Sequence, residues 1–229
     1  MANVAHLQEA DIEKIYLCPL FKGVETAKLA SIIKKPYTKV ATHEDDTVLF
    51  KTGQKMNQLL LVLDGEVGVI GTNLWNKGSI VELLGAGTLY GAEFAVGADK
   101  KLGYDICTLE NSRVLTIDYV KLLCDSDYRK IAPIISENLL QFAIARTHNL
   151  QARIYHLAQG STREKLLAYL SDQSRQAKNT TFQIDLDRQD LADYLSVERS
   201  AMCAELSKMQ KDGLINYHKN EFTLKKIKK

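Results

Sequence analysis

The stretch Asp187–Gly213, DRQDLADYLSVERSAMCAELSKMQKDG, decides how the C-terminal part of this chain folds. Asp187 is a suitable N-cap, because its carboxylate can accept hydrogen bonds from the free N–H groups of a first helical turn. Leu191 and Leu195 then recur four residues apart on one helical face. Ser196-Val197-Glu198 breaks this period, so the pattern predicts a short helix that ends in a tight turn.

A second amphipathic helix is predicted to begin near Arg199 and to end at Gly213, which is placed as a C′ residue. Its apolar face is formed by Met202, Leu206 and Met209. A helix of about 8 residues, a turn of about 3 and a helix of about 14 have the layout of a helix-turn-helix, whose second helix enters the DNA major groove. A plain helical hairpin with a structural role is the alternative.

The residues that follow, 214–224, favour the DNA-binding interpretation. They form two short β-rich runs around a polar Lys219-Asn220 turn, which predicts a hairpin. A hairpin directly after a recognition helix is the wing of a winged helix. The chain then carries a basic tail suited to phosphate contact, formed by Lys225, Lys226, Lys228 and Lys229.

The composition is that of an ordinary globular protein, with 229 residues, 45% of them hydrophobic and 25% charged. Because the net charge is only +2, any affinity for DNA must come from where the charges are placed. The sequence has neither an apolar run of about 18 residues nor an apolar N-terminal signal segment. The scattered cysteines are therefore expected to be reduced thiols in a cytoplasmic protein; they are Cys18, Cys107, Cys124 and Cys203.

Between about Lys39 and Asp118, short β-rich runs alternate with glycines. The predicted strands are Thr47–Phe50, Leu59–Asp64, Val67–Gly71, Ser79–Leu84, Tyr104–Thr108 and Arg113–Asp118. Asp64-Gly65-Glu66 and Asn76-Lys77-Gly78 are suitable hairpin turns. This pattern predicts an antiparallel barrel or jelly roll, preceded by a helical segment over Asp11–Ile33.

A long helix is predicted over Tyr128–Leu157. A heptad seam follows it in steps of four and three, through Ile131, Ile135, Asn138, Phe142, Ala145, Asn149, Ala152 and His156. We expect this seam to form a parallel homodimer, because a helix-turn-helix usually needs two copies to read a two-fold operator. A single helix packed on its own barrel is the alternative.

The junction Gln159-Gly160-Ser161 interrupts this helix, and Ser161 with Glu164 forms a capping box for a helix over Thr162–Ala177. We therefore expect a hinge at this junction. The predicted fold class is α+β, with an N-terminal double-stranded β-helix and a C-terminal winged helix-turn-helix. Three domains are expected: a β-barrel effector-sensing domain (1–126), a dimerisation helix (127–158) and a DNA-binding domain (159–229).

A glycine-rich barrel, a long dimerising helix, a hinge and a winged helix-turn-helix, in this order, resemble the Crp/Fnr superfamily of bacterial transcription regulators. The resemblance covers nearly the whole chain and is most specific over Thr162–Leu224. There, TREKLLAYL and DRQDLADYLSVERSAMCAELSKMQKDGLI look similar to a clostridial-type subgroup. The resemblance implies a homodimer that binds a palindromic double-stranded DNA operator, is controlled by a small effector and contacts RNA polymerase.

The family's DNA-contact residues carry over to this sequence position by position. Arg188 and Gln189 match residues that contact backbone phosphates, and Arg199 matches an arginine that holds guanine in a bidentate fork. The wing turn His218-Lys219 matches a phosphate contact. The complete set expected at the DNA is Arg188, Gln189, Arg199, Ser200, Cys203, Ala204, His218 and Lys219.

Two of these positions depart from the family's pattern. Ala204 stands where a second base-reading arginine is common, and Ser200 replaces the acid that the cyclic-AMP receptor uses. The sequence preference at those base pairs is therefore expected to differ from that receptor's.

The effector site departs further. In cyclic-AMP binders an arginine pairs with the phosphate and a glutamate with the ribose, whereas Leu102 and Ala92 stand at those positions here, within Gly91-Ala92-Glu93 and Leu102-Gly103. A buried phosphate without a cationic partner is strongly disfavoured. We therefore expect no response to cyclic AMP, although Lys100 and Lys101 lie close by in the sequence. An unidentified effector is expected instead, enclosed by these barrel residues and by the helix near Asn149 and Leu150.

No cofactor or metal is expected, because the cysteine spacing does not suit an iron–sulfur cluster. A metal-binding cupin-like enzyme would need several histidines on barrel strands, and the barrel holds only His43, so no catalytic residue is predicted. A protein-interaction module with a degenerate helix-turn-helix is a third alternative, favoured by Ala204 and disfavoured by Arg199. Trp75 is expected to be a turn aromatic.

Overall fold

The computed structural model describes residues 3–4, 8–72, 78–96 and 101–225, and the chain divides into two compact units, residues 1–144 and 145–229. This division falls inside the long helix α5 (Ala132–Leu157), whereas the expected domain boundaries at 126/127 and 158/159 stay predictions. Several predicted features lie outside the described residues. These are the residues 73–77 of the second hairpin turn, with Trp75, together with Lys100 and the tail residues Lys226, Lys228 and Lys229.

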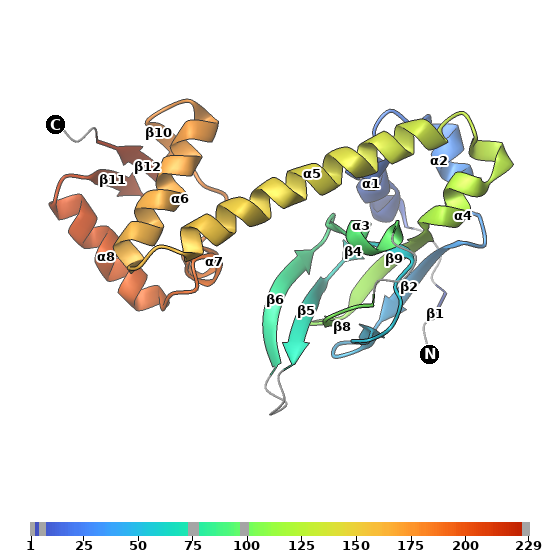
Figure 1. Ribbon diagram of the computed structural model, residues 1–229, viewed down its shortest axis with the longest axis horizontal. Helices are drawn as coiled ribbons and strands as arrows, with labels where there is room; N and C mark the ends of the chain where they lie inside the picture. Colours follow the sequence, from blue (N-terminus) through green and yellow to red (C-terminus); the bar gives the residue numbers. More distant parts are fainter. Residues whose placement is uncertain (1–2, 5–7, 73–77, 97–100, 226–229) are drawn as a thin grey trace. The chain divides into compact units, whose positions relative to one another are not determined.

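Unit 1 contains two antiparallel sheets that face each other as a jelly roll (Figure 1). The first has the order β1-β2-β9-β4-β7, formed by Asn3–Val4, Thr38–His43, Ser112–Asp118, Gln58–Asp64 and Leu89–Tyr90. The second has the order β3-β8-β5-β6, formed by Val48–Phe50, Asp105–Thr108, Glu66–Thr72 and Gly78–Gly85. All six predicted strands are present, while β1, β2 and β7 were not predicted as strands.

The central strand β4 explains why the first sheet is apolar on both faces. Leu59 and Leu61 point to the helical side of the sheet, whereas Leu60 and Val62 point into the roll. All four side chains are at most 1% exposed, so this strand is a continuous apolar run and shows no alternation. The β4–β5 turn needs Gly65, whose φ is +79° and whose added Cβ would lie 2.5 Å from the Ser112 hydroxyl.

Helices cover the outer face of the first sheet. They are α1 (Glu9–Leu17), η1 (Pro19–Phe21), α2 (Thr26–Ile33), α4 (Tyr119–Cys124), η2 (Ser126–Tyr128) and the first part of α5; the short α3 (Ala92–Ala95) follows β7. The predicted helical segment over Asp11–Ile33 is present as α1, η1 and α2, because the chain breaks between α1 and α2. Cys18 precedes Pro19 and is extended, and Gly23 adopts a φ of +79°.

The predicted dimer seam lies against the protomer's own unit 1 at its N-terminal end. Ile135 is fully buried in the core of that unit, and Ile131 and Phe142 pack against the same core. Asn138 donates to the carbonyls of Leu20 and Lys22, at 3.0 and 2.8 Å. The heptad pattern here is that of a helix packed on its own barrel. Further along, Ala145 and Asn149 are exposed, Ala152 is half-buried and His156 is buried.

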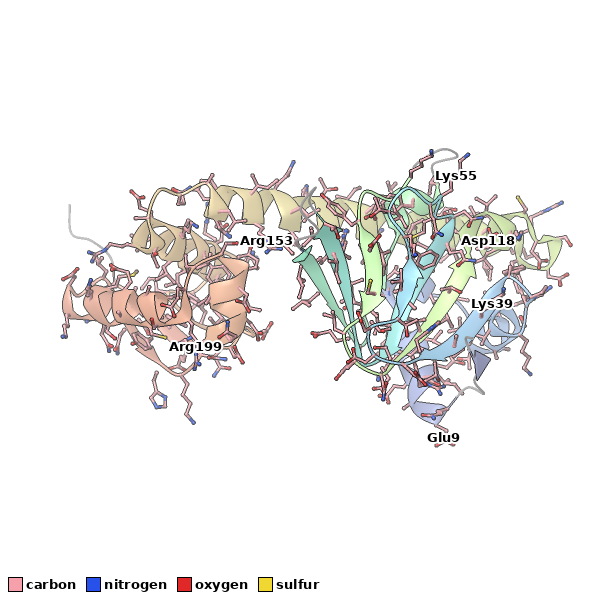
Figure 2. The ribbon with its side chains drawn as sticks, turned by 90° about the horizontal axis from the view of Figure 1, so that it is seen from below. Glu9, Lys39, Lys55, Asp118, Arg153 and Arg199 are labelled. Atoms are coloured by element: carbon pink, nitrogen blue, oxygen red, sulfur yellow. The ribbon has the colours of Figure 1, made fainter. Side chains whose placement is uncertain are left out.

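Unit 2 comprises the end of α5, α6 (Thr162–Ala177), α7 (Arg188–Tyr194), α8 (Arg199–Lys211) and a three-stranded sheet of order β10-β12-β11. The strands are β10 (Thr181–Gln183), β11 (Ile215–His218) and β12 (Glu221–Leu224). The apolar residues predicted for both helix faces are fully buried in one core; they include Leu191, Leu195, Met202, Leu206 and Met209. Figure 2 shows Arg199 at the start of α8. The predicted α+β fold with a winged helix-turn-helix is confirmed.

Candidate nucleic-acid interface

The turn between α7 and α8 is fixed by backbone geometry and by one lysine. Asp187 caps α7 by accepting from the N–H groups of Gln189 and Asp190, at 2.6 and 2.9 Å. Ser196 adopts a φ of +51°, which reverses the chain within the turn. The ammonium of Lys165 in α6 donates to the Leu195 carbonyl, at 3.1 Å, and so satisfies one of the free carbonyls at the end of α7. These contacts set the direction in which α8 leaves the turn.

Glu198 caps the recognition helix α8. Its carboxylate accepts from the N–H groups of Ser200 and Ala201, at 2.8 and 2.7 Å, and from the Ser200 hydroxyl. The hydrogen bond from that hydroxyl, followed by the two backbone bonds, lowers the pKa of Glu198 below its ordinary value of 4.5. The Ser200 hydroxyl proton is therefore held by the cap, which leaves its oxygen only as an acceptor from an amino group on a base edge and not as a donor to a phosphate.

The predicted contact residues of α8 differ in accessibility. Arg199 is exposed, and within the described residues its guanidinium has no hydrogen-bonding or ionic partner. Ser200 and Ala204 are also exposed, on neighbouring turns of the helix. Cys203 is half-buried and packs against the core of unit 2. The first turn of α8 thus offers one free bidentate donor, on Arg199, beside a small and nearly featureless surface.

Arg188 holds the wing instead of facing outward. Its guanidinium donates to the Lys219 carbonyl and lies over the rings of Phe222 and Tyr217, at 5.1 and 5.5 Å from their centroids. Its second terminal nitrogen is buried and has no hydrogen-bond partner. The position that the family resemblance assigns to a phosphate contact is therefore occupied by a residue that links the start of α7 to the wing turn.

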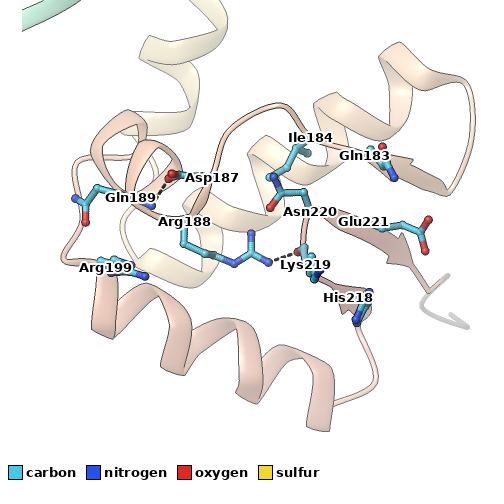
Figure 3. Close-up of a pocket in the computed structure, with 10 residues that line it drawn as sticks. All are labelled: Gln183, Ile184, Asp187, Arg188, Gln189, Arg199, His218, Lys219, Asn220 and Glu221. Carbon is cyan, nitrogen blue, oxygen red and sulfur yellow. Dashed lines mark hydrogen bonds between the residues drawn. The ribbon is translucent and has the colours of Figure 1, made fainter.

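A groove of 810 Å³ lies between the start of α7, the start of α8 and the wing (Figure 3). It brings together five of the predicted DNA-contact residues: Arg188, Gln189, Arg199, His218 and Lys219. Lys219, at the tip of the wing, adopts a φ of +51° and is exposed, as is His218. The predicted Ser200, Cys203 and Ala204 lie on α8 outside the lining of this groove.

The groove carries an excess of free cationic groups. Two acids line it, Asp187 and Glu221, but the Asp187 carboxylate is used by the α7 cap. The ammonium of Lys219 and the guanidinium of Arg199 have no intramolecular partner in the part of the chain that the structure describes. Exposed cations without internal partners remain available to pair with phosphates and base edges, which is the electrostatic requirement for DNA binding.

Comparison with known families agrees with this geometry. Residues 164–229 match the Crp-like helix-turn-helix domain, and residues 41–123 match the cyclic nucleotide-binding domain. The chain has the domain architecture of the Crp/Fnr superfamily. No curated protein matches the sequence.

Solved structures of Crp-type proteins share the fold. The catabolite activator protein of Thermus thermophilus is 21% identical, with a TM-score of 0.50, and the match covers 90% of this chain and 93% of that one. The global regulator CLP of Xanthomonas campestris, described as c-di-GMP responsive, is 18% identical with a TM-score of 0.54, over 86% of this chain and 100% of that one. No helix among the described residues is long and apolar enough to cross a membrane.

Two residues of the region that corresponds to the Crp/Fnr effector cassette are buried. Leu102 is 2% exposed and belongs to the core inside the roll, and Ala92 is buried at the start of α3. Gly91 has a φ of +95°, and a Cβ there would lie 2.8 Å from the Gln58 carbonyl. Glu93 and Gly103 are exposed. The predicted Asn149 and Leu150 belong to unit 2, where both are exposed.

The cysteines of this Crp/Fnr-type chain are not gathered at one place. Cys18 and Cys107 are buried, Cys203 is half-buried and Cys124 is exposed. Burial raises the pKa of the Cys18 thiol to about 11, which keeps it protonated and unreactive. Among the described residues, no three His, Cys, Asp or Glu side chains lie close enough to share a metal ion.

Sequence reasoning missed two features of the interface. Glu198 was assigned to the turn only, because the usual N-cap residues are Ser, Thr, Asp and Asn and a glutamate is not among them. The stacking of Arg188 on Tyr217 and Phe222 had no signal in the sequence, because it depends on the pairing of β11 with β12 in three dimensions.

Proposed function

We propose that this chain is a homodimeric, sequence-specific regulator of transcription that binds a palindromic double-stranded DNA operator. The observation that carries the proposal is Arg199, an exposed arginine that has no partner among the described residues and lies in the first turn of a capped helix. The helix-turn-helix places this first turn where base edges are read in the major groove. A bidentate contact from a guanidinium to guanine O6 and N7 is the most common specific pairing at such a position.

The other residues of the interface divide into contacts and supports. Lys219 and His218 present the wing to the backbone phosphates, and Gln189 lies at the exposed start of α7 for the same purpose. Arg188 supports the wing turn from inside. Ser200 and Ala204 add little direct readout, since the first has its proton bound by Glu198 and the second has no polar group. Specificity is therefore expected to rest mainly on Arg199.

Selection from a random duplex library tests this function. We expect the wild-type protein to enrich a palindrome whose half-sites are about one helical turn apart, each with a guanine at a fixed position. The Arg199→Ala variant is expected to enrich no fixed guanine, with the fold unchanged. Failure of the wild type to enrich any site would refute sequence-specific binding and favour an interaction module with a degenerate helix-turn-helix.

The homodimer is proposed to use a different face of α5 from the predicted seam. Leu140, Ile144 and Ile154 are spaced four and ten residues apart, so they lie on one helical face, and they are 60%, 48% and 66% exposed. Apolar side chains of this size, repeated along a helix and left in water, are expected to pair with a second copy. Ile131, Ile135 and Phe142 of the predicted seam lie on the opposite side of the helix, where they pack on the core of unit 1.

A small molecule that binds unit 1 is proposed to control the protein, and cyclic AMP is proposed not to be this molecule. Leu102 and Ala92, both buried, occupy the two positions at which cyclic-AMP binders place the cation for the phosphate and the acid for the ribose. Micromolar binding of cyclic AMP in a calorimetric titration would overturn this part of the proposal. An effector can only shift the equilibrium between two arrangements of the units by its differential affinity for them.

We propose that the hinge lies at the division between the two compact units, and not at the junction 159–161 that the sequence predicts. Gln159-Gly160-Ser161 lies within unit 2, and the division between the units falls after Ile144. The proposal further includes contact with RNA polymerase, membership of the clostridial-type subgroup and, because its DNA target lies there, a cytoplasmic location.

A further inference from the structure

A cavity in the jelly roll lies away from the cassette. It is a cavity of 380 Å³ between β2 of the first sheet and β3, the edge strand of the second. None of the predicted effector residues lines it, and the cassette follows β7 at the opposite edge of the first sheet. Its volume falls within the range of about 300–1,000 Å³ that is usual for small-molecule sites.

The polar side of this cavity is built by strand alternation. Lys39 and His43 of β2 point into it, while the intervening Val40 points to the helical core. Lys39 pairs across the sheet with Thr116 of β9, so these two side chains are direct neighbours at the opening. In the described part of the chain, none of Lys39, His43 and Thr116 has a side-chain hydrogen bond or ion pair.

The charge on the described lining of the cavity is positive. No aspartate or glutamate lines it. Burial lowers the pKa of His43, so at neutral pH its ring is uncharged and still offers an N–H donor. Lys39 is therefore the cation of the described lining, and Figure 2 shows its place on β2.

The inner end of the cavity is apolar. Leu60 and Val114, which are 0% and 2% exposed, belong to the core inside the roll. Phe50 of β3 packs against the same core and is only half-buried. The cavity therefore runs from an ammonium, a hydroxyl and an imidazole at the opening to a hydrocarbon surface within. Partly exposed apolar side chains beside unpaired donors are the arrangement expected of a site for a ligand with a polar head and an apolar body.

We infer that this cavity binds a small aliphatic or aromatic monocarboxylate. The carboxylate accepts from the Lys39 ammonium and the Thr116 hydroxyl, and the hydrocarbon part lies against Leu60, Val114 and Phe50. A single ammonium matches a single negative charge, and the apolar inner end matches a body without further polar groups. The inference rests on the proposed function only in naming this acid as the effector, since binding itself requires no DNA.

Calorimetric titration of the full-length protein with acetate, hexanoate, octanoate and decanoate tests the inference. Affinity is expected to rise with chain length until the apolar end is filled. Octan-1-ol, which lacks the charge, is expected to bind at least about tenfold more weakly than octanoate. Lys39→Met keeps the apolar stem of the lysine and removes its charge, so it is expected to reduce octanoate affinity by about the same factor. Lys34→Met, on an exposed lysine outside the cavity, is the matched control and is expected to change nothing.

A second variant tests where the hydrocarbon part of the ligand binds. Ala41→Trp fills the cavity from the inner face of β2, between Lys39 and His43, and is expected to abolish binding of both octanoate and octan-1-ol. Thermal unfolding of the same variant shows whether unit 1 still folds; if it does not, Val114→Phe replaces it.

The inference is overturned if no acid of the series binds, if Lys39→Met binds octanoate as tightly as the wild type, or if cyclic AMP binds through Lys39. In each of these cases the DNA selection still reports on the proposed function separately. Conversely, octanoate binding that depends on Lys39, in a protein that selects no DNA site, would support the cavity and refute the regulator.

Discussion

His156, in the last turn of α5, lies 2.6 Å from Asp172 of α6, measured from Nε2 to Oδ2, and is only 2% exposed. Its Nδ1 lies 3.1 Å from the hydroxyl of Tyr194 at the end of α7. Nε2 forms a hydrogen bond with the Asp172 carboxylate, and Nδ1 forms one with the Tyr194 hydroxyl. One buried side chain thus joins the end of α5 to α6 and to the first helix of the helix-turn-helix.

Replacing His156 with alanine is expected to destabilise unit 2 selectively. The change removes two partly buried hydrogen bonds and the ring contacts with Tyr169 and Tyr194, so we expect a loss of about 2–4 kcal/mol. Native-state hydrogen exchange should report this loss in the amides of α7 and not in those of the jelly roll. His148→Ala, on an exposed histidine of the same helix, is the control. Unchanged exchange in α7 would show that His156 does not hold these helices together.

Alanine substitutions at Arg199 and at Arg188 are expected to weaken DNA binding in different ways. Arg199→Ala should reduce specific binding by about 1–3 kcal/mol and relax the preference at one base position, while leaving the fold intact. Fluorescence anisotropy with the selected site and with point-mutated sites measures both effects. An equal loss on every sequence would remove Arg199 from base readout.

Arg188→Ala is expected to loosen the wing, because the guanidinium donates to the Lys219 carbonyl and stacks on Phe222. Faster hydrogen exchange in β11 and β12 should accompany a loss of affinity for all sequences. If exchange in the wing is unchanged and only the salt dependence of binding becomes flatter, Arg188 is a phosphate contact after all.

Local signals predicted much of unit 2. The Asp187 cap, the break at Ser196 and the Gly213 terminus each depend on the conformation of a few consecutive residues, and each is present in the structure. The apolar faces of α7 and α8 followed from helical spacing alone. By contrast, β10 is only three residues long and pairs with β12, which lies far along the chain, so its sequence carries no comparable signal.

Long-range packing limited the rest of the prediction. Along α5, a heptad pattern indicates that a helix face is apolar and says nothing about which surface covers that face. Ile135 and Phe142 pack on the protomer's own core, and the polar Asn138 is satisfied by the Leu20 and Lys22 carbonyls instead of a partner helix. The cavity beside Lys39 escaped notice for a related reason. β2 was not predicted as a strand, so the shared face of Lys39 and His43 was not apparent.

The Glu198 cap gives α8 a pH-dependent contribution to stability. The pKa of Glu198 is lower in the folded state than its ordinary value of 4.5. The contribution is therefore fully present above about pH 4.5 and is lost as the pH falls through the folded-state pKa. Glu198→Gln is expected to lower the melting temperature of unit 2 by roughly 2–5 °C at pH 7, and the difference from wild type should shrink below about pH 4.5. Glu221→Gln, on an exposed acid of the wing that caps no helix, is the control. A difference that persists unchanged in acid would show that the carboxylate charge plays no part.

A substitution to glutamate is expected to have different effects on the two faces of α5. Ile144→Glu places a charge on the exposed face that we assign to the dimer, and burying two such charges across a two-fold axis is unfavourable, so a folded monomer is expected. Phe142→Glu instead places a charge against the core of unit 1, so it should unfold that unit. Sedimentation at micromolar concentration measures the mass, and circular dichroism measures the fold. Leu17→Glu, on a leucine that is 75% exposed on α1, should leave both unchanged. If Ile144→Glu remains a dimer, or if the wild type is a monomer, the Leu140–Ile154 face is not the interface.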